Sequence, residues 1–235
     1  MKKYTKYLIA GAIAFMLAFV LSLKSAPAQE AARFDFHVRN DFFAGFSGNM
    51  ELLDRGMAAC EKALAENPKN PEALVWHGAG LYFKGGQAMQ HGDQQAGMPM
   101  IQKGIAEMDR AVELAPDNIG VRIPRGAVLL TAAQFTPPQF GKPLVERGIS
   151  DYQRSFDLQK TRLMEMGSHP RGELLSGLAL GNAYLGNTDK AEEFFLKLKE
   201  TNPNSPYSKR ADKWLQAKTL SPAESRCIGC HVPGK

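Results

Sequence analysis

Apolar residues recur along most of residues 49–216 at the spacing that places them on one face of an α-helix. No stretch alternates apolar and polar residues for long enough to indicate a β-strand, and prolines and glycines fall between the long helical segments. The hydrophobic pattern therefore predicts an all-α fold.

Three of these amphipathic segments end in the same way. Each closes with a proline and is followed by another helical pattern, and a proline disfavours the helical conformation of the residue before it. The endings are ACEKALAENPKNP (59–71), EMDRAVELAPDN (107–118) and FFLKLKETNPNSP (194–206). A recurring ending of this kind indicates an internal repeat of helix–turn–helix units.

This pattern resembles the tetratricopeptide repeat (TPR), a helix–turn–helix unit with small residues where its two helices cross and a proline at its end. The last repeat carries the family's residues in order, with a turn two residues shorter than usual: Leu180, Gly181, Tyr184, Ala191, Phe195 and Pro203. Three earlier segments carry parts of the pattern: Gly56, Cys60, Ala63 and Pro68; then Leu74, Gly78, Leu81, Gly104, Met108, Ala111 and Pro116; then Arg122, Gly126, Leu129, Gly148, Tyr152 and Ser155.

The resemblance implies a right-handed TPR-like solenoid over residues 49–216. Its glycines would allow helices to cross closely, and Cys60 would fill an apolar core position. We expect residues 29–48 to be an N-terminal lead-in, and residues 217–235 to be a linker and a short tail.

Two connections within the helix pairs are longer than a normal turn, one between Leu81 and Gly104 and one between Leu129 and Gly148. Both lie at the same corner of their repeat, so both should protrude from one edge of the stack, where solenoids often place binding loops. The alternative is that the first helices are extended by a turn or two, because long loops without structure of their own are uncommon.

Residues 1–28 have the order of a secretory signal peptide. Three lysines come first, an apolar run from Leu8 to Leu23 follows, and an Ala-Pro-Ala sequence ends at Ala28. We expect cleavage near Ala28 and a periplasmic or secreted location in a bacterium. An uncleaved membrane anchor is the alternative, although the run is short of the roughly 20 apolar residues that a full span needs.

The export segment also accounts for most of the basic charge. The chain carries +5, and residues 1–28 contain four lysines and no acidic residue, which leaves +1 for the rest. The charge is therefore no indication of nucleic-acid binding, and no basic run with interleaved aromatic residues appears later in the chain.

The sequence CIGCH near the C-terminus resembles the haem-attachment site of c-type cytochromes. In such sites two cysteines, separated by two residues, add to the two vinyl groups of one porphyrin, and the following histidine ligates the iron. The corresponding residues are Cys227, Cys230 and His231. Attachment of this type takes place outside the cytoplasm, which agrees with the export signal. The resemblance implies one covalent haem c.

Three other roles of the cysteine pair remain open from the sequence alone. A zinc site needs four ligands, and His231 is the only further candidate close in sequence. A thioredoxin-like pair needs a strand before it and a helix after it. A plain disulfide leaves His231 without a role. Haem attachment accounts for all three residues.

Only four residues follow His231, so we expect the haem to be covered by the repeat body, by a partner, or hardly at all. A sixth iron ligand would come from elsewhere in the chain. His77 lies at a helix crossing and is expected to pack in the core, whereas His91 lies beside several methionines in a longer connection and is the first candidate. The full set is His37, His77, His91, His169, Met89, Met98 and Met100.

Together these features predict an exported helical scaffold with one haem on its tail, which exchanges electrons with a redox partner recruited by the repeat surface. The alternative is a binding or assembly module of the cell envelope whose CxxCH has no electron-transfer role. A peroxidase-like enzyme with an open iron site is a third hypothesis, and no acid–base or nucleophile constellation in the sequence supports it.

Overall fold

The computed structural model describes residues 33–219, and this part of the chain contains helices and no strand. The predicted all-α fold is confirmed. The α-helices are α3 (Asp35–Phe46), α4 (Met50–Glu66), α5 (Pro71–Gln90), α6 (Gln94–Leu114), α7 (Ile119–Ala133), α8 (Pro138–Gln159), α9 (Ser168–Tyr184), α10 (Thr188–Thr201) and α11 (Pro206–Ala217), and the 3-10 helix η1 (Lys160–Glu165) follows α8.

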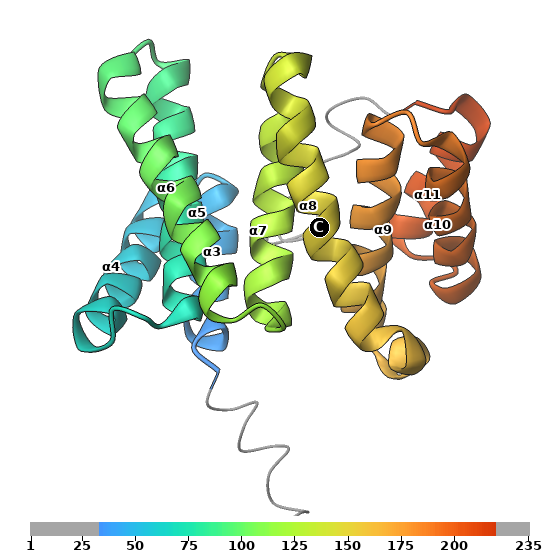
Figure 1. Ribbon diagram of the computed structural model, residues 1–235, viewed down its shortest axis with the longest axis horizontal. Helices are drawn as coiled ribbons and strands as arrows, with labels where there is room; N and C mark the ends of the chain where they lie inside the picture. Colours follow the sequence, from blue (N-terminus) through green and yellow to red (C-terminus); the bar gives the residue numbers. More distant parts are fainter. Residues whose placement is uncertain (1–32, 220–235) are drawn as a thin grey trace, which may run out of the picture.

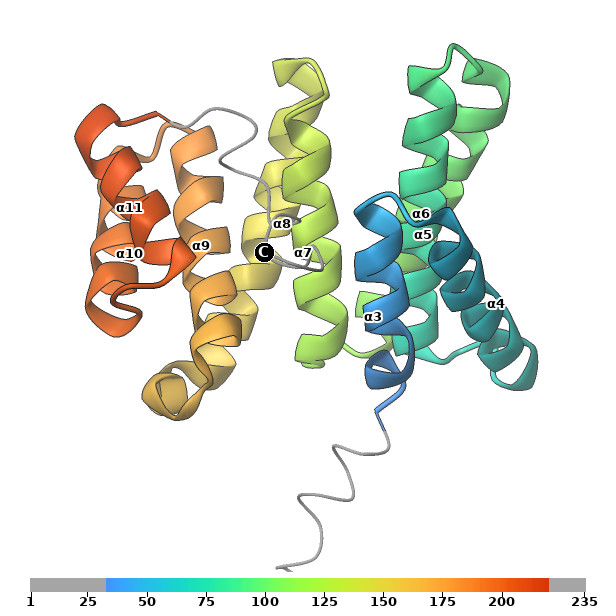
Figure 2. The same cartoon turned by 180° about the vertical axis from the view of Figure 1, so that it is seen from behind.

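Consecutive helices pack as four pairs, α3–α4, α5–α6, α7–α8 and α9–α10, and α11 packs on the last pair. In Figures 1 and 2, α7–α8 stands between α5–α6 and α9–α10, α11 lies beside α10 at one end, and α3–α4 overlaps α5–α6 at the other end. The odd-numbered helices also contact one another from pair to pair. They therefore form one layer, and the even-numbered helices lie against it.

The three helix ends predicted from proline are confirmed. α4, α6 and α10 each end two residues before a proline. The helix that follows begins with a side chain that accepts a hydrogen bond from a free N–H of the first turn. Asn70 accepts from the N–H of Ala73 at 3.1 Å, Asn118 from that of Gly120 at 2.8 Å, and Ser205 from that of Ser208 at 3.0 Å. A stop signal followed closely by a start signal explains these short turns.

Glycines let the helices of a pair approach closely. A Cβ added at Gly78 would lie 2.6 Å from the carbonyl oxygen of Gly104, and one added at Gly104 would lie 2.5 Å from that of Gly78. Gly126 and Gly148 face each other in the next pair, where a Cβ added at either glycine would lie 3.2 Å from the carbonyl oxygen of the other. Backbone meets backbone at both crossings, so no side chain fits between the helices.

The two long connections are helical. α5 continues to Gln90 and α6 begins at Gln94, so that residues 91–93 alone connect them, and residues 134–137 connect α7 to α8. Extended helices are therefore the correct alternative, and neither corner carries a long binding loop. Both extended hairpins point to the same edge of the molecule, at the top of Figure 1.

The predicted lead-in contains helix α3, which the hydrophobic pattern does not indicate. This helix packs on α4 and α5, and its fully buried Phe42 has its ring centroid 5.3 Å from that of Trp76. Cys60 is also fully buried in this first core, as predicted. A second core lies among the last helices, around Tyr152 and Phe195.

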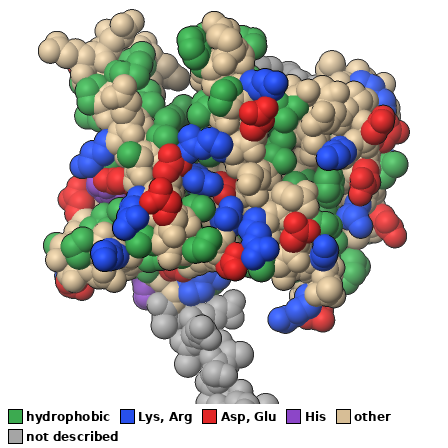
Figure 3. All heavy atoms as spheres, viewed as in Figure 1, with side chains coloured by type: hydrophobic (Ala, Val, Ile, Leu, Met, Phe, Trp, Pro, Cys, Tyr) green, Lys and Arg blue, Asp and Glu red, His purple; other side chains and the backbone are tan. Residues whose placement is uncertain are grey.

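A network of ion pairs joins α6, α7 and α8 and so links the two cores. Arg125 donates to Asp151 at 2.6 Å and to Asp109 at 3.1 Å, and Arg122 donates to Asp151 at 2.7 Å. Asp151 is completely buried, and this burial raises its pKa, although the two arginines oppose the shift. On the face seen in Figure 3, acidic and basic side chains are interspersed across the middle of the molecule.

Candidate functional site

The predicted haem-attachment residues Cys227, Cys230 and His231 lie outside the described residues, as does the predicted signal segment 1–28. The last described residue is Thr219, eight residues before Cys227. The structure therefore describes the base of the predicted tail, which is built from α7, α8, α9 and the end of α11.

Lys218 ends α11 and sets the direction in which the chain leaves it. The residue has φ 55°, in the left-handed region that side chains other than glycine rarely adopt, and its N–H donates to the carbonyl oxygen of Trp214 at 2.6 Å. Its side chain holds this turn in place. Nζ lies 4.9 Å from the centroid of the Trp214 ring and donates to Glu192 at 2.6 Å.

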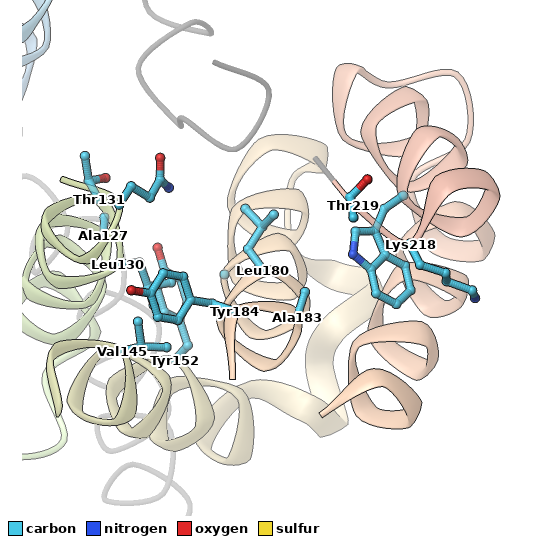
Figure 4. A pocket seen from close by; sticks show the side chains of 13 residues that line it. Ala127, Leu130, Thr131, Val145, Tyr152, Leu180, Ala183, Tyr184, Lys218 and Thr219 are labelled. Atoms are coloured by element: carbon cyan, nitrogen blue, oxygen red, sulfur yellow. The ribbon is translucent and has the colours of Figure 1, made fainter. Parts of the chain in front are cut away.

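A cavity of about 350 Å³ lies between α7, α8, α9 and the C-terminal end of α11 (Figure 4). Its walls are largely apolar, with Leu130 from α7, Val145 from α8, Leu180 from α9 and Trp214 from α11. The stacking of Trp214 on Phe195, with ring centroids 4.7 Å apart, fixes the α11 side of the cavity.

Small residues leave this space open. Ala127 from α7 and Ala183 from α9 line the cavity with a single methyl group each, and Gly177 of α9 makes room for the ring of Tyr152, which would clash with a Cβ at this position. Lys218 and Thr219 also line it, so the described chain ends at the cavity wall (Figure 4). The tail that carries the predicted attachment residues therefore starts from this cavity.

Few polar groups face the cavity. The hydroxyl of Tyr184 donates to the carbonyl oxygen of Ala133 at 3.1 Å and so has its partner. The buried Oε1 of Gln134 has no hydrogen-bond partner among the described residues. A buried acceptor without a donor is unusual in folded proteins.

His77 is buried, as predicted, but its partners are carboxylates. Its Nδ1 lies 2.6 Å from Glu107, and its Nε2 lies 3.6 Å from Glu61. Both ring nitrogens are therefore engaged, and His77 is not available to an iron in this arrangement. The two glutamates lie on the neighbouring helices α4 and α6, and their role is not evident from the sequence.

The other candidate iron ligands are scattered over the molecule. His91 is exposed at the turn between α5 and α6, and Met98 and Met100 are exposed on the first turns of α6. His37 is exposed on α3. His169 lies at the start of α9, with its Nδ1 2.9 Å from the hydroxyl of Tyr207. Among residues 33–219, no histidine or methionine lines the cavity at the end of α11.

Cys60 lies in a different part of the molecule from this cavity, and its thiol is unreactive. It is completely buried in the first core, and burial raises the pKa of its thiol to about 12. A thiol that stays protonated and inaccessible neither binds a metal nor attacks a disulfide. Its role in the structure is to fill the core.

Within the described part of the chain, no group of three or more histidine, cysteine, aspartate or glutamate side chains is placed to hold a metal ion. In the same residues, no helix combines the length and the apolar character needed to cross a bilayer. Comparison of the chain with protein-family models, with curated proteins and with solved structures finds no match.

Proposed function

We propose that this protein is an exported helical scaffold that carries one covalently attached haem c on its C-terminal tail and exchanges electrons with a recruited partner protein. The observation that carries the proposal is the CIGCH sequence at residues 227–231 behind an N-terminal export signal. A CxxCH sequence alone is also compatible with a zinc site or a disulfide, and an export signal alone specifies no cofactor. Together they supply the reacting side chains and the compartment that c-type attachment needs.

The donor set of Cys227, Cys230 and His231 suits this cofactor. Each thiol would hold the haem through a C–S bond to one vinyl group, with the thiol hydrogen passing to the neighbouring vinyl carbon, so that attachment would need no oxidant or reductant. The imidazole of His231 would hold the iron. When bound, the haem supplies an iron that gains or loses one electron, and the partner protein provides or accepts that electron.

We also infer that the helix pairs form a right-handed TPR-like solenoid. The chain-order stacking of the pairs, the glycine contacts where α5 crosses α6 and α7 crosses α8, and the proline-terminated helices support this inference. Stacked repeats present an extended surface to a partner. In this arrangement the helical body recognises the partner and the tail carries the electron.

The test is production of the full chain with its export signal in cells that have a haem-maturation system. We expect a haem absorption band and a matching mass increase that survive denaturation, because two thioether bonds hold the cofactor. Cys227→Ala and Cys230→Ala should each impair attachment. Cys60→Ala is the matched control and should leave attachment unchanged, since Cys60 is buried in the first core.

A chain that remains haem-free under these conditions, or that holds stoichiometric zinc at Cys227 and Cys230, would rule the proposal out. A reversible reduction potential together with rapid electron exchange with a co-purifying redox protein is expected for an electron carrier. A haem that exchanges no electrons with any co-purifying protein would instead identify an assembly module.

A further inference from the structure

We propose that the cavity between α7, α8, α9 and the end of α11 receives the haem carried by residues 220–235 of the same chain. The inference rests on the proposed haem attachment. The attachment motif does not specify where the haem packs, and this inference supplies that place. The cavity would be filled by the haem on the tail of the same chain.

The tether places the haem within reach of this cavity. Thr219 itself lines the cavity, and Cys227 follows eight residues later. Eight residues span at most about 26–29 Å when fully extended, so the haem stays within this distance of Thr219 and reaches the cavity without full extension. A short tether of this kind gives an effective concentration on the order of millimolar, which favours docking within one chain.

The cavity also suits the chemistry of a porphyrin. A volume of about 350 Å³ falls at the lower end of the roughly 300–1,000 Å³ typical of small-molecule sites, so it suits the apolar edge of the ring rather than the whole cofactor. Leu130, Val145, Leu180 and Trp214 would pack on that edge.

Docking in this cavity leaves the sixth iron position to water or to a partner. No histidine or methionine of the described helices lines the cavity, and its Tyr184 and Lys218 already bond to Ala133 and Glu192. His91 lies at the α5–α6 turn, and the α7–α8 pair stands between this hairpin and α9 (Figure 1). His91→Ala should therefore leave the haem absorption spectrum unchanged, and a changed spectrum would count against this docking.

The main experiment is methyl NMR of the full, haem-loaded chain with ferric iron. A paramagnetic haem shifts or broadens the signals of nearby methyl groups. We expect changes at the cavity methyls of Leu130, Val145 and Leu180, and none at those of Leu53 and Leu74 in the first core. The haem-free Cys227→Ser/Cys230→Ser chain provides the diamagnetic reference.

A cavity variant and a matched control make the assignment specific. Ala127→Glu places a charge in the cavity and should abolish the methyl changes while the haem stays covalently attached. Ala183→Glu, on the facing helix, should do the same. Ala58→Glu introduces the same side chain at an exposed position of α4 and should preserve the changes. All three variants should keep the helical circular dichroism of the parent chain.

The outcomes separate this inference from the proposed function. A covalent haem without methyl changes at the cavity overturns the docking and leaves the proposed function standing. A chain that acquires no covalent haem overturns both. Methyl changes that grow with protein concentration assign the docked haem to a second copy of the chain and also overturn docking within one molecule.

Discussion

Asp151 is a completely buried carboxylate that two arginines of the neighbouring helix hold in place. Burial raises its pKa despite Arg122 and Arg125, so the ion pairs do not fully offset the cost of removing the charge from water. Buried networks of this kind are weak sources of net stability. The value of this one is that it fixes how α7 packs on α8.

Breaking the network should nevertheless be costly, because both arginines stay charged. We predict that Asp151→Asn lowers the free energy of unfolding by about 3 kcal/mol, measured by urea denaturation at pH 7. Asp157→Asn is the matched control, since it removes an exposed carboxylate that bonds Lys160 at 3.2 Å and should leave the denaturation midpoint unchanged. Equal midpoints for the two variants would contradict the prediction.

At the residue scale, the sequence predicts which side chains are buried better than it predicts which side chains they contact. Helical periodicity suffices to place Cys60 and His77 in the interior, and both are buried. It does not pair His77 with Glu107, or Arg125 with Asp151, because those residues lie 30 and 26 positions apart. Such contacts depend on how one helix is aligned along the next, and the pattern of a single helix does not contain that information.

At the scale of elements, the sequence predicts where a helix ends when a proline follows it, but it does not predict how far α5 and α7 extend. A proline two residues beyond the helix marks the ends of α4, α6 and α10, so these three ends could be placed from sequence, whereas α8, α9 and α10 begin without a capping side chain. From the sequence, the glycine- and proline-containing segments after Leu81 and Leu129 are compatible with protruding loops or with extended helices. They are helical because Gly85 packs directly on Gly97 across the α5–α6 hairpin, and Gly141 on the backbone of Ala133 across the α7–α8 hairpin.

Helix α3 is missed for a different reason. It contacts both α4 and α5, so its apolar residues occur on more than one face. An element covered from two sides shows little amphipathic contrast, and the period that identifies the other helices is weak in it. Its fully buried Phe42 and Val38 nevertheless belong to the first core, so this core already includes part of the predicted lead-in.

Two glycines of α5 should respond oppositely to the same substitution. Gly78→Ala would put a methyl group 2.6 Å from the Gly104 carbonyl oxygen and force α5 and α6 apart, so we predict a loss of about 1–3 kcal/mol in the free energy of unfolding. Gly86→Ala, in the same helix, meets nothing within 4 Å and should gain up to about 1 kcal/mol from helix propensity. Thermal denaturation of both variants is the measurement, and two shifts of the same sign would contradict the prediction.

At the scale of the whole molecule, the described helices contain both cores, so the body should fold without its tail. We predict that a chain ended after Thr219 keeps its helical circular dichroism and melts cooperatively, because repeats are stabilised by their neighbours. A chain ended after Thr201 is the informative comparison. It lacks α11 with the buried Tyr207 and Trp214, and should melt at a lower temperature. Loss of most helical signal in the longer chain would show that the tail is part of the core.

The two parts of the candidate site differ in how far sequence reveals them. The proposed attachment motif is five consecutive residues, so its chemistry can be proposed without a fold. The cavity at its base is formed by side chains from four helices spread over residues 127–219. Nothing local distinguishes Ala127 or Gly177 from other small residues of a helix crossing, so this part of the site becomes evident only from the packed structure.

The complete burial of Cys60 also bears on how the chain matures. A chain with three thiols in an oxidising compartment has three ways to form one disulfide, and two of them would join Cys60 to Cys227 or Cys230. With a pKa of about 12, only about one Cys60 side chain in 10⁵ is a thiolate at pH 7, and the thiolate is the form that reacts. Once the first helix pairs have folded, Cys60 no longer competes for Cys227 and Cys230. In the proposed haem attachment, the first core would therefore prevent a wrong disulfide at cysteines more than 160 residues away.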